Sequence, residues 1–332
     1  MKGYLRLLLA MAVLLLLIPI PAYSTAVTDT APPSSSPQDT PADTTPTLPT
    51  DEAVFRLLCG EEVVTLTEED FLIRTLAMEM SPDLHEEALK AQAVAAYTYY
   101  ARRRQAQSEK ADPTLRGADF ATPNAQFPHA YTEENLRIRW GEQYEANYDR
   151  LKAAISAVKG IAITYENTLI DACYHAISSG NTESAETVWG ADIPYLQAVA
   201  SPGDRLSPTY ASEAAFTADQ VRSILTAELP DMQLGEDPTA WFGAPTLSDA
   251  GTVADQPVGN SHLAGTRIRT LFGLRSAAFS VTYTDGCFTF SVRGYGHGVG
   301  MSQYGADYLA RQGYTYDEIL RYYYTDVEIG PI

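Results

Sequence analysis

Glu79 is the residue of this 332-residue chain whose type and setting best suit acid–base chemistry. It is the one carboxylate in the run Leu72–Met80, and it lies on the apolar side of that segment. At about 100° per residue, Glu79 shares a helical stripe with Leu76. Burial there disfavours the charged form, raises the pKa and suits the carboxyl group to donating a proton. The alternative is a structural glutamate in an ion pair with Arg102 or Arg103.

A glycine-rich segment near the C-terminus, Gly294–Gly305, carries His297, Gln303 and Tyr304. Its glycines permit tight turns and the close approach of another chain or a ligand. The segment is not a phosphate loop, because no Gly-Lys-Ser/Thr follows it. His297 has glycine on both sides, so little bulk shields it. It is either a cleft residue or a structural histidine that bonds to the backbone.

A second segment, residues 173–190, combines hydroxyl and amide side chains with an aromatic residue. Such a loop has the groups that a sugar-binding groove needs, although the same residues could equally cap the loop itself. A Ser–His hydrolase fits poorly, because the chain has no nucleophile-elbow motif. His175, Ser178 and Ser179 are therefore candidate groove residues.

Metal-binding patterns are weak in this chain. Four histidines are candidate ligands: His85, His129, His175 and His297. They show neither HExxH nor a similar spacing, so the sequence does not support a zinc site. The cysteines stand far apart, at Cys59, Cys173 and Cys287. One disulfide with a spare thiol and three buried thiols are both compatible with that spacing.

The elements around Glu79 must hold it in place. Residues 53–66 predict two short strands. Thr67 is expected to cap a helix that contains Glu79, with acidic residues in its first turn, where negative charge is favourable. Ser81-Pro82 is expected to interrupt that helix and start a second one, with proline at the first helical position. Arg102–Arg104 complement the C-terminal end of the second helix. Glu79 is thereby predicted at a helix–helix corner that lines a cleft.

The rest of the chain mixes helices and strands. The second helix has a narrow alanine stripe that lets a neighbouring backbone approach closely, and Gln92 lies at its edge. The segment of about 203–266 shows no regular sequence pattern along its length and is predicted as a variable insert. The expected elements are helices near Glu145–Val158 and Asp219–Glu228, strands at Ile161–Tyr165, Leu169–Tyr174, Phe279–Tyr283 and Cys287–Arg293, and two closing helices. This order predicts an α+β fold with small mixed sheets.

The N-terminus has the layout of an export signal. Lys2 and Arg6 precede an apolar run from Leu7 to Ile20. The run is short for a membrane span, which favours cleavage, but a tilted anchor is also compatible with it. The predicted organisation is a signal peptide or membrane anchor over 1–24, a disordered Pro/Thr/Ser linker over 25–52, and a domain over 53–332 that works outside the cytoplasm.

The composition limits the kinds of molecule that this chain can bind. Hydrophobic residues make up 45% of the chain, enough for a sizeable core in one or two domains. The formal net charge is −19. So negative a protein is a poor match for nucleic acid, and long-range attraction cannot bring it to polyanions.

Four stretches together resemble the stage II sporulation protein D family, which includes sporulation lytic transglycosylases and amidase-enhancer relatives. They are Ala77–Ala96, Tyr174–Leu196, Phe272–Ser276 and Gly294–Ala306. They occur in the family's order over most of residues 53–330. Each stretch is long and unusual, which makes chance similarity a poor explanation.

The resemblance implies cleavage of the MurNAc–GlcNAc bond of peptidoglycan without water. The family's catalytic glutamate falls on Glu79. As an acid it would protonate the glycosidic oxygen, and as a base it would then take the proton of the C6 hydroxyl, whose attack on C1 leaves a 1,6-anhydro end. One carboxylate serves both steps, unlike the paired carboxylates of ordinary glycosidases. The residues expected to bind glycan or to hold Glu79 are His175, Ser178, Ser179, Tyr195, His297, Gln303 and Tyr304.

Three positions depart from the family pattern. Members commonly have arginine where this chain has Tyr97, and lysine where it has Gln197. Some members carry a Cys/His zinc pattern where this chain has Thr122–Pro128, which contains neither residue type. The resemblance therefore implies no cofactor and a weaker grip on substrate, for which Arg102–Arg104 could compensate.

The resemblance also implies partners and a location. The partners are peptidoglycan glycan strands, a cell-wall amidase of the engulfment machinery, and the membrane through the N-terminal segment. The location is extracytoplasmic, either secreted or membrane-tethered, and between forespore and mother cell if the role is specific to sporulation. A competing function is a non-catalytic module that binds glycan and enhances a wall amidase, and a zinc hydrolase is a third.

Overall fold

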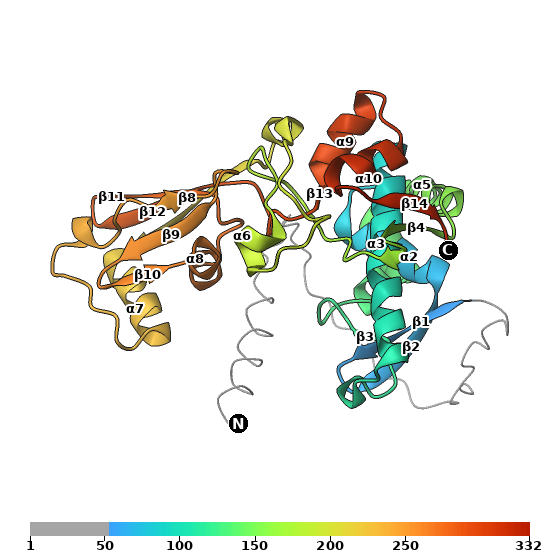
Figure 1. The fold of residues 1–332 in the computed structure, drawn as a ribbon. Coiled ribbons are helices and arrows are strands. Elements are labelled where there is room, and N and C mark those ends of the chain that lie inside the picture. Colours follow the sequence, from blue (N-terminus) through green and yellow to red (C-terminus); the bar gives the residue numbers. More distant parts are fainter. Residues whose placement is uncertain (1–52) are drawn as a thin grey trace, which may run out of the picture. The chain divides into compact units, whose positions relative to one another are not determined.

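The computed structural model describes residues 53–332, which form an α+β fold of helices and small sheets, as predicted (Figure 1). The predicted export signal or anchor over 1–24 and the predicted linker over 25–52 lie outside the described residues. Within 53–332, no helix combines the length and the apolar composition that crossing a membrane requires.

The description begins with the predicted pair of strands, β1 (Val54–Cys59) and β2 (Glu62–Thr67), which form an antiparallel hairpin. The helix α2 (Glu68–Glu79) follows directly. The Thr67 side chain caps it by accepting a hydrogen bond from the Asp70 backbone N–H at 3.1 Å, and three acidic residues occupy its first turn. Both features stabilise a helix N-terminus, so the start of this helix follows from local sequence.

The next helix, α3 (Glu86–Glu109), does not start at Pro82, and that prediction is wrong. Residues 81–85 form a turn, and the ring of His85 caps the helix by accepting a hydrogen bond from the Glu87 N–H. The backbone N–H of His85 is itself held by the Asp307 carboxylate at 2.6 Å. This contact spans 222 residues, so local sequence could not have revealed it.

The placement of Arg102–Arg104 at the end of that helix is also wrong. The helix continues to Glu109 and has no basic residue in its last turn. The segment after Arg104 is rich in glutamine and alanine, which are good helix formers, so nothing stops the helix at the arginines.

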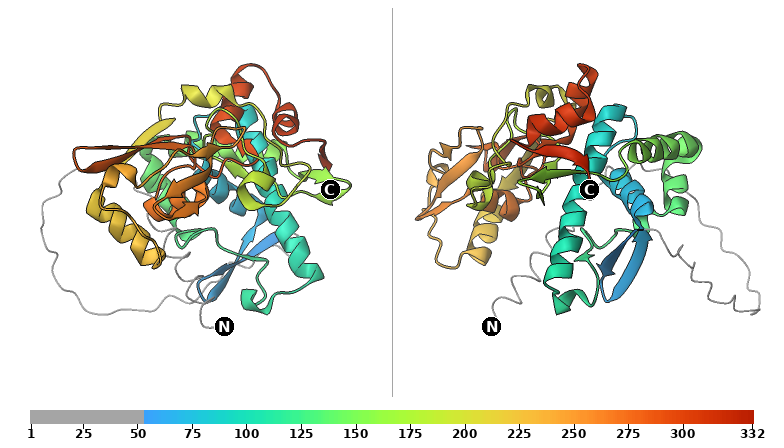
Figure 2. Two further views of the ribbon diagram at one scale, coloured as in Figure 1. Left: turned by 60° about the vertical axis from the view of Figure 1, so that its left-hand side comes forward. Right: turned by 45° about the vertical axis from the view of Figure 1, so that its right-hand side comes forward.

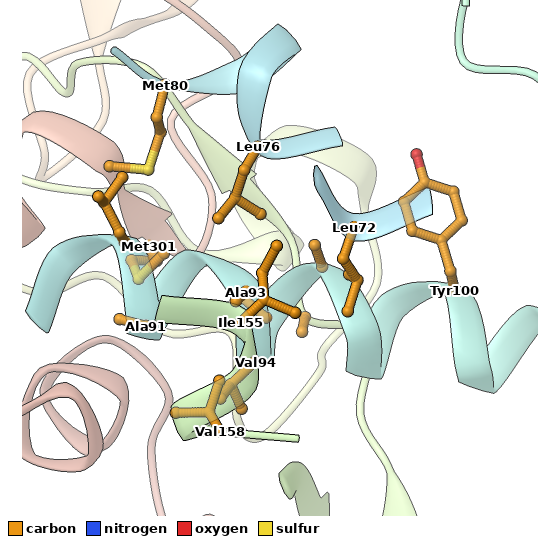
Figure 3. Packing of buried hydrophobic residues seen from close by; sticks show 14 of the residues in the cluster. Leu72, Leu76, Met80, Ala91, Ala93, Val94, Tyr100, Ile155, Val158 and Met301 are labelled. Atoms are coloured by element: carbon orange, nitrogen blue, oxygen red, sulfur yellow. The ribbon is translucent and has the colours of Figure 1, made fainter. Parts of the chain in front are cut away.

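Helices and strands pack around α2 and α3 to form the first hydrophobic core (Figure 3). In the close-up, Leu72 and Leu76 of α2 face Ala93 and other residues of α3, and Met80, which follows α2, lies beside Met301. The surrounding elements are β3 (Phe120–Ala121), α4 (Glu133–Trp140), α5 (Tyr144–Ala157), β4 (Ile161–Tyr165), β5 (Thr168–Leu169) and β14 (Glu328–Pro331). The predicted helix near Glu145–Val158 and the strand Ile161–Tyr165 are thus confirmed.

The predicted strand Leu169–Tyr174 is wrong as a single element. Its ends belong to two sheets: β5 pairs with β4, whereas β6 (Tyr174–His175) pairs in parallel with β13 (Met301–Ser302). Residues 170–173 cross between these sheets. An apolar run shows that such a segment is buried, but it does not show which partners its backbone bonds to.

Residues 211–293 form a second hydrophobic core. One sheet has the strand order β11-β12-β7, and another has the order β10-β9-β8. In Figure 1 and in the right-hand view of Figure 2 these elements lie together, to the left of α2, α3 and α5. They are β7 (Ala211–Thr217), α7 (Ala218–Glu228), β8 (Thr246–Leu247), β9 (Val253–Val258), β10 (Ser261–Leu263), α8 (Gly265–Phe272), β11 (Phe279–Thr284) and β12 (Cys287–Arg293).

The predicted helix Asp219–Glu228 and the two predicted strands in 279–293 are confirmed. The segment predicted as a variable insert, 203–266, provides β7, which pairs with β12 along its whole length, from Ala211 opposite Arg293 to Thr217 opposite Cys287. This part of the segment therefore shares a sheet with β11 and β12, which lie between the last two family stretches.

Two helices follow β13, as predicted: α9 (Gln303–Arg311) and α10 (Tyr316–Tyr323). Both pack against α3. The final strand, β14, was not predicted, and it pairs antiparallel with β4. Because α9 begins immediately after β13, the β6–β13 pairing fixes where the first residue of α9 meets α2 and α3.

Candidate functional site

Glu79 is the last residue of α2, at the corner where the chain turns toward α3. It is partly exposed, and its carboxylate oxygen Oε2 accepts a hydrogen bond from Nε2 of Gln303 at 3.3 Å. Burial raises the pKa of Glu79, and the hydrogen bond from Gln303 opposes that shift without cancelling it. Glu79 is therefore a desolvated carboxyl group that favours its protonated form more than an exposed glutamate does.

The structure does not support the alternative of an ion pair with arginine. Arg102 and Arg103 both contact the Asp171 carboxylate, at 3.8 and 3.4 Å. Arg104 bonds to Glu68 at 2.7 Å. Among the described residues, no basic side chain forms a salt bridge with Glu79, and compensation by the three arginines for substrate binding stays a prediction.

Gln303 reaches Glu79 because it is the first residue of α9. Ser302 caps that helix, accepting the Gly305 N–H at 3.2 Å. The Nε2 of Gln303 also lies 3.4 Å from Oε1 of Gln92 on α3, so one amide nitrogen serves both Glu79 and Gln92. Gln92 is fully buried, and its own Nε2 has no hydrogen-bond partner within the described part of the chain.

The charge of Glu79 acts on the pKa of three tyrosines. They are Tyr99 and Tyr100 on α3 and Tyr174 on β6. Burial raises the pKa of each, and the negative charge of Glu79 adds to the shift. All three hydroxyls therefore stay neutral near Glu79. Sequence analysis overlooked them, although Tyr174 precedes His175 in one of the family stretches.

His175 and His297 lie close together, with ring centroids 5.7 Å apart. His297 Nε2 bonds to the Tyr174 carbonyl at 2.9 Å, and its Nδ1 accepts the Val299 N–H at 3.1 Å. Burial lowers the pKa of His297 to about 4, with Arg269 adding to the shift. Burial likewise lowers the pKa of His175 to about 3, and His297 adds to that shift. Both rings are neutral at physiological pH.

The remaining predicted site residues make backbone contacts. The Ser178 backbone N–H donates to Asp204 at 2.9 Å, and the Ser179 hydroxyl donates to the Ala250 carbonyl at 3.1 Å. Tyr304 donates to the Leu206 carbonyl at 3.2 Å. Tyr195 accepts the Asp171 N–H at 3.1 Å. These bonds shape the loops, and the prediction that these residues bind glycan stays a prediction.

A pocket whose lining is mostly apolar but includes several polar side chains brings part of the predicted site together. It lies between the segment 177–188, the glycine-rich segment and the second core. Its polar lining includes Ser178, Ser179, Asn181, Glu183, Thr187, Arg293 and His297. Glu79 is not one of the residues that line it. The predicted helix–helix corner at Glu79 is confirmed by the ends of α2 and α3. That this corner lines a cleft stays a prediction.

Trp189 lies next to this pocket, at the end of α6 (Ala185–Trp189). Its side chain is 47% exposed, and its ring centroid lies 5.4 Å from that of His297. The two residues before it, Thr187 and Val188, line the pocket. An exposed aromatic face beside hydroxyl, amide and charged groups can stack on a sugar ring while the polar groups bond to its hydroxyls.

Tyr97 is not beside Glu79. It lines a hollow with Glu68 and Glu69, at the opposite end of α2. Glu68 and Glu79 are eleven positions apart, or roughly 16 Å along a helix. The side-chain N–H of Gln197 donates a hydrogen bond to the Ile193 carbonyl at 2.9 Å. The change from arginine to Tyr97 therefore alters the packing at the start of α2, away from the carboxylate.

The remaining candidates from the sequence are the histidines and cysteines within residues 53–332. No group of three or more His, Cys, Asp or Glu side chains there is arranged to hold a metal ion. Of the four candidate histidines, His85 serves as the cap of α3. Cys59, Cys173 and Cys287 are free thiols in the described structure. Burial raises the pKa of Cys173 to about 12, so its thiol is a poor nucleophile.

Comparison with known proteins indicates the same family as the sequence motifs. The family model described as stage II sporulation protein matches residues 60–165. The chain is similar to a stage II sporulation protein D of Bacillus amyloliquefaciens, 35% identical over 271 residues that cover 82% of this chain and 76% of the relative. It is similar to the stage II sporulation protein D of Bacillus subtilis (strain 168), 34% identical over 298 residues, or 90% and 84% of the two chains.

A more distant similarity extends to an amidase enhancer of Bacillus subtilis (strain 168). The two are 25% identical over 294 residues, which cover 74% of this chain and 38% of that relative. The family model and the two stage II sporulation D relatives thus match the part of the chain that contains α2, α3 and Glu79.

Proposed function

Because this chain belongs to the stage II sporulation protein D family, we propose that it is a lytic transglycosylase that cleaves the MurNAc–GlcNAc bond of peptidoglycan during sporulation. The observation that carries the proposal is Glu79, a desolvated carboxyl group whose pKa burial raises. It has no second carboxylate as a hydrogen-bond partner in the described structure, and its one side-chain partner is the Gln303 amide.

The proposed reaction needs a carboxyl group that works in both directions. In the first step, Glu79 transfers its proton to the glycosidic oxygen, and the bond from that oxygen to C1 of MurNAc breaks. In the second step, the Glu79 carboxylate takes the proton of the C6 hydroxyl while that oxygen bonds to C1. Glu79 thus ends protonated, the leaving sugar keeps the first proton, and the product carries a 1,6-anhydro ring.

A raised pKa suits both steps, because proton transfer is most efficient when the pKa of the catalytic group lies near the working pH. Ordinary glycosidases divide the acid and nucleophile or base roles between two carboxyl groups. The surroundings of Glu79 instead provide the neutral amides of Gln303 and Gln92. These groups can position sugar hydroxyls without adding a second negative charge.

The pocket beside Trp189 supports glycan binding in the same protein. The partners that we propose are glycan strands of peptidoglycan and a cell-wall amidase. The proposed location is extracytoplasmic, with the predicted segment 1–24 acting as signal or membrane anchor. The second proposed partner rests on the amidase enhancer among the similar proteins.

The test is a digest of purified peptidoglycan, and of glycan stripped of its stem peptides, by the wild-type protein and by Glu79→Gln. We expect 1,6-anhydro ends from the wild type and a loss of at least about 100-fold in the variant, because a general acid–base residue typically contributes 10²–10⁴-fold. The matched control is Glu86→Gln, which removes a carboxylate from the exposed start of α3. Equal product from Glu79→Gln and the wild type would refute the catalytic role.

The second candidate function is enhancement of an amidase without catalysis, which the similarity to an amidase enhancer favours. It predicts that the protein alone releases no anhydro products. It also predicts that Glu79→Gln stimulates a purified wall amidase as well as the wild type does. The two digests, with and without amidase, separate the two functions.

A further inference from the structure

The amides of Gln92 and Gln303 form a short chain that leads away from the Glu79 carboxylate. Gln303 is 6% exposed and Gln92 is fully buried. The Nε2 of Gln303 lies 3.3 Å from Oε2 of Glu79 and 3.4 Å from Oε1 of Gln92. An amide nitrogen has two N–H groups, so in this arrangement Gln303 donates to both neighbours.

The ionised form of Glu79 requires this arrangement, whereas the protonated form keeps one oxygen that can accept but gains an O–H that neither amide accepts. A carboxylate accepts from the Gln303 N–H, but a protonated carboxyl group has a proton of its own to donate. The arrangement also leaves both N–H groups of the buried Gln92 amide without a partner. A buried donor without a partner is costly, so this side chain has an unused bonding capacity next to the site.

We propose that the side-chain amides of Gln303 and Gln92 turn over together when Glu79 takes up a proton, so that the pair satisfies both states of the acid–base residue. After the turn, the Gln303 oxygen faces Glu79 and accepts its O–H. The same oxygen accepts an N–H of Gln92, because a carbonyl oxygen has two lone pairs. The turn exchanges nitrogen and oxygen positions, breaks no covalent bond and leaves the backbone where it is.

The geometry makes the turn inexpensive. The outward-facing oxygen of Gln303 is not among the buried atoms that lack a partner, so water can bond to either atom placed there. The turn gives one N–H of Gln92 a partner and takes away the partner of the Gln92 oxygen, so the number of unpaired groups on this buried amide stays the same. Gln92 is thus a positioning residue, since it acts on Glu79 only through Gln303.

Few other groups can take part in the response. The titratable side chains whose pKa responds to the charge of Glu79 are Tyr99 and Tyr100 on α3 and Tyr174 on β6, and burial keeps all three neutral. Arg103, a cation next to Tyr99, lies over the ring of that tyrosine, 3.3 Å from its centroid, and contacts Asp171. The structure therefore assigns the hydrogen-bonding response to Glu79 protonation to the two amides.

The experiment is an NMR pH titration of the full-length protein, kept in detergent micelles because of its apolar N-terminal run. Glutamine side chains carry ¹⁵N and glutamate carboxyl groups carry ¹³C. The signals of Glu79, Gln303 and Gln92 are assigned by their loss in Glu79→Gln, Gln303→Met and Gln92→Met. Gln256 is the internal control, because it is equally buried but donates to the Gly243 carbonyl at 2.7 Å, in the second core.

We expect the Gln92 and Gln303 amide signals to shift at the same midpoint pH as the Glu79 carboxyl signal, while Gln256 stays constant. In Gln303→Met, Glu79 should still titrate, but the Gln92 signal should lose its pH response because the link is gone. Gln92 signals that stay constant through the Glu79 titration in the wild type would overturn the proposal. So would a Gln92 response of unchanged size in Gln303→Met, since the charge alone would then explain it.

This proposal rests on the proposed function, because the two amides assist catalysis only if Glu79 is catalytic. The NMR titration, however, gives a result whether or not the protein is active. If the wild type released no anhydro products while Gln92 followed Glu79, the proposed function would fail and the coupled amides would stand. If anhydro products formed while Gln92 stayed constant, the reverse would hold. In an active protein, Gln92→Met should lower the rate and narrow the pH range of activity, whereas a purely structural role would change stability alone.

Discussion

Glu79 is held in a state that favours function over stability. The free carboxyl group of an unfolded chain is ionised at pH 7, whereas burial in the folded protein raises the pKa of Glu79. At pH values between the two pKa values, the folded state binds more protons than the unfolded state. Stability contributed by this group is therefore lost as the pH rises through that window. Active-site groups often carry such a cost, because function requires the strained environment.

At the residue scale we predict that Glu79→Gln stabilises the protein at pH 7. A neutral amide avoids the cost of burying a charge, and each unit by which the pKa is raised corresponds to about 1.4 kcal/mol. Thermal unfolding of both proteins between pH 4 and pH 8 measures the effect. The melting temperature of the variant should be higher at pH 7, and the gap should shrink toward pH 4, near the ordinary pKa of glutamate. A gap that is constant with pH, or a less stable variant at pH 7, would contradict the argument.

At the scale of elements, the site depends on the pairing of β6 with β13, because α9 starts at the next residue. Gly300 allows the backbones of these two strands to approach each other closely. It has φ of 72°, a left-handed conformation, and a Cβ added there would meet the carbonyl oxygen of Cys173. That carbonyl accepts the Met301 N–H at 3.1 Å, so the same atom holds the strand pair together.

We therefore predict that Gly300→Ala destabilises the protein by several kcal/mol and disturbs the contact between Gln303 and Glu79. The matched control is Gly313→Ala, where φ is 96° but no atom lies within 4 Å of the added Cβ. The control should cost only about 1–2 kcal/mol, the price of left-handed backbone for a residue with a Cβ. Urea unfolding measures both. Equal losses would show that backbone strain, and not the clash with Cys173, explains the requirement for glycine.

At the scale of the whole described molecule, two hydrophobic cores support different parts of the site. The first core holds α2, α3 and Glu79. The second holds β7, β11 and β12, and its neighbours supply one wall of the pocket beside Trp189. Separate cores can open separately, since local unfolding follows contiguous packed units.

We predict that Phe290→Ala, a fully buried residue of the second core, speeds amide hydrogen exchange in β7, β11 and β12 while α2 and α3 keep their protection. The reciprocal variant, Phe55→Ala in the first core, should loosen β1, β2 and α2 instead. Removing a buried phenylalanine typically costs 3–5 kcal/mol, enough to show in the exchange rates. Hydrogen exchange followed by mass spectrometry gives the answer. Uniform acceleration in both variants would mean that the two cores unfold as one.

Sequence and structure contributed different things to this picture. Local chemistry was enough for the β1–β2 hairpin and for the capped start of α2, because turn and cap residues act on their own neighbours. The start of α3 was missed because its cap, His85, is fixed by Asp307 from the far end of the chain. Leu169–Tyr174 was read as one strand, since periodicity shows burial but not which sheet a backbone joins.

By itself, the sequence determined that Glu79 lies on the buried side of a helix, and its motifs determined the family. Only the tertiary structure decided what surrounds that carboxylate. It brought Gln303 from 224 residues away and placed Gln92 behind it. It directed the arginines to Asp171 and Glu68, and Tyr97 to the other end of α2. The physical reason is that a helix stripe fixes which side of Glu79 is buried, whereas its hydrogen-bond partners come from strand pairing that no local pattern encodes.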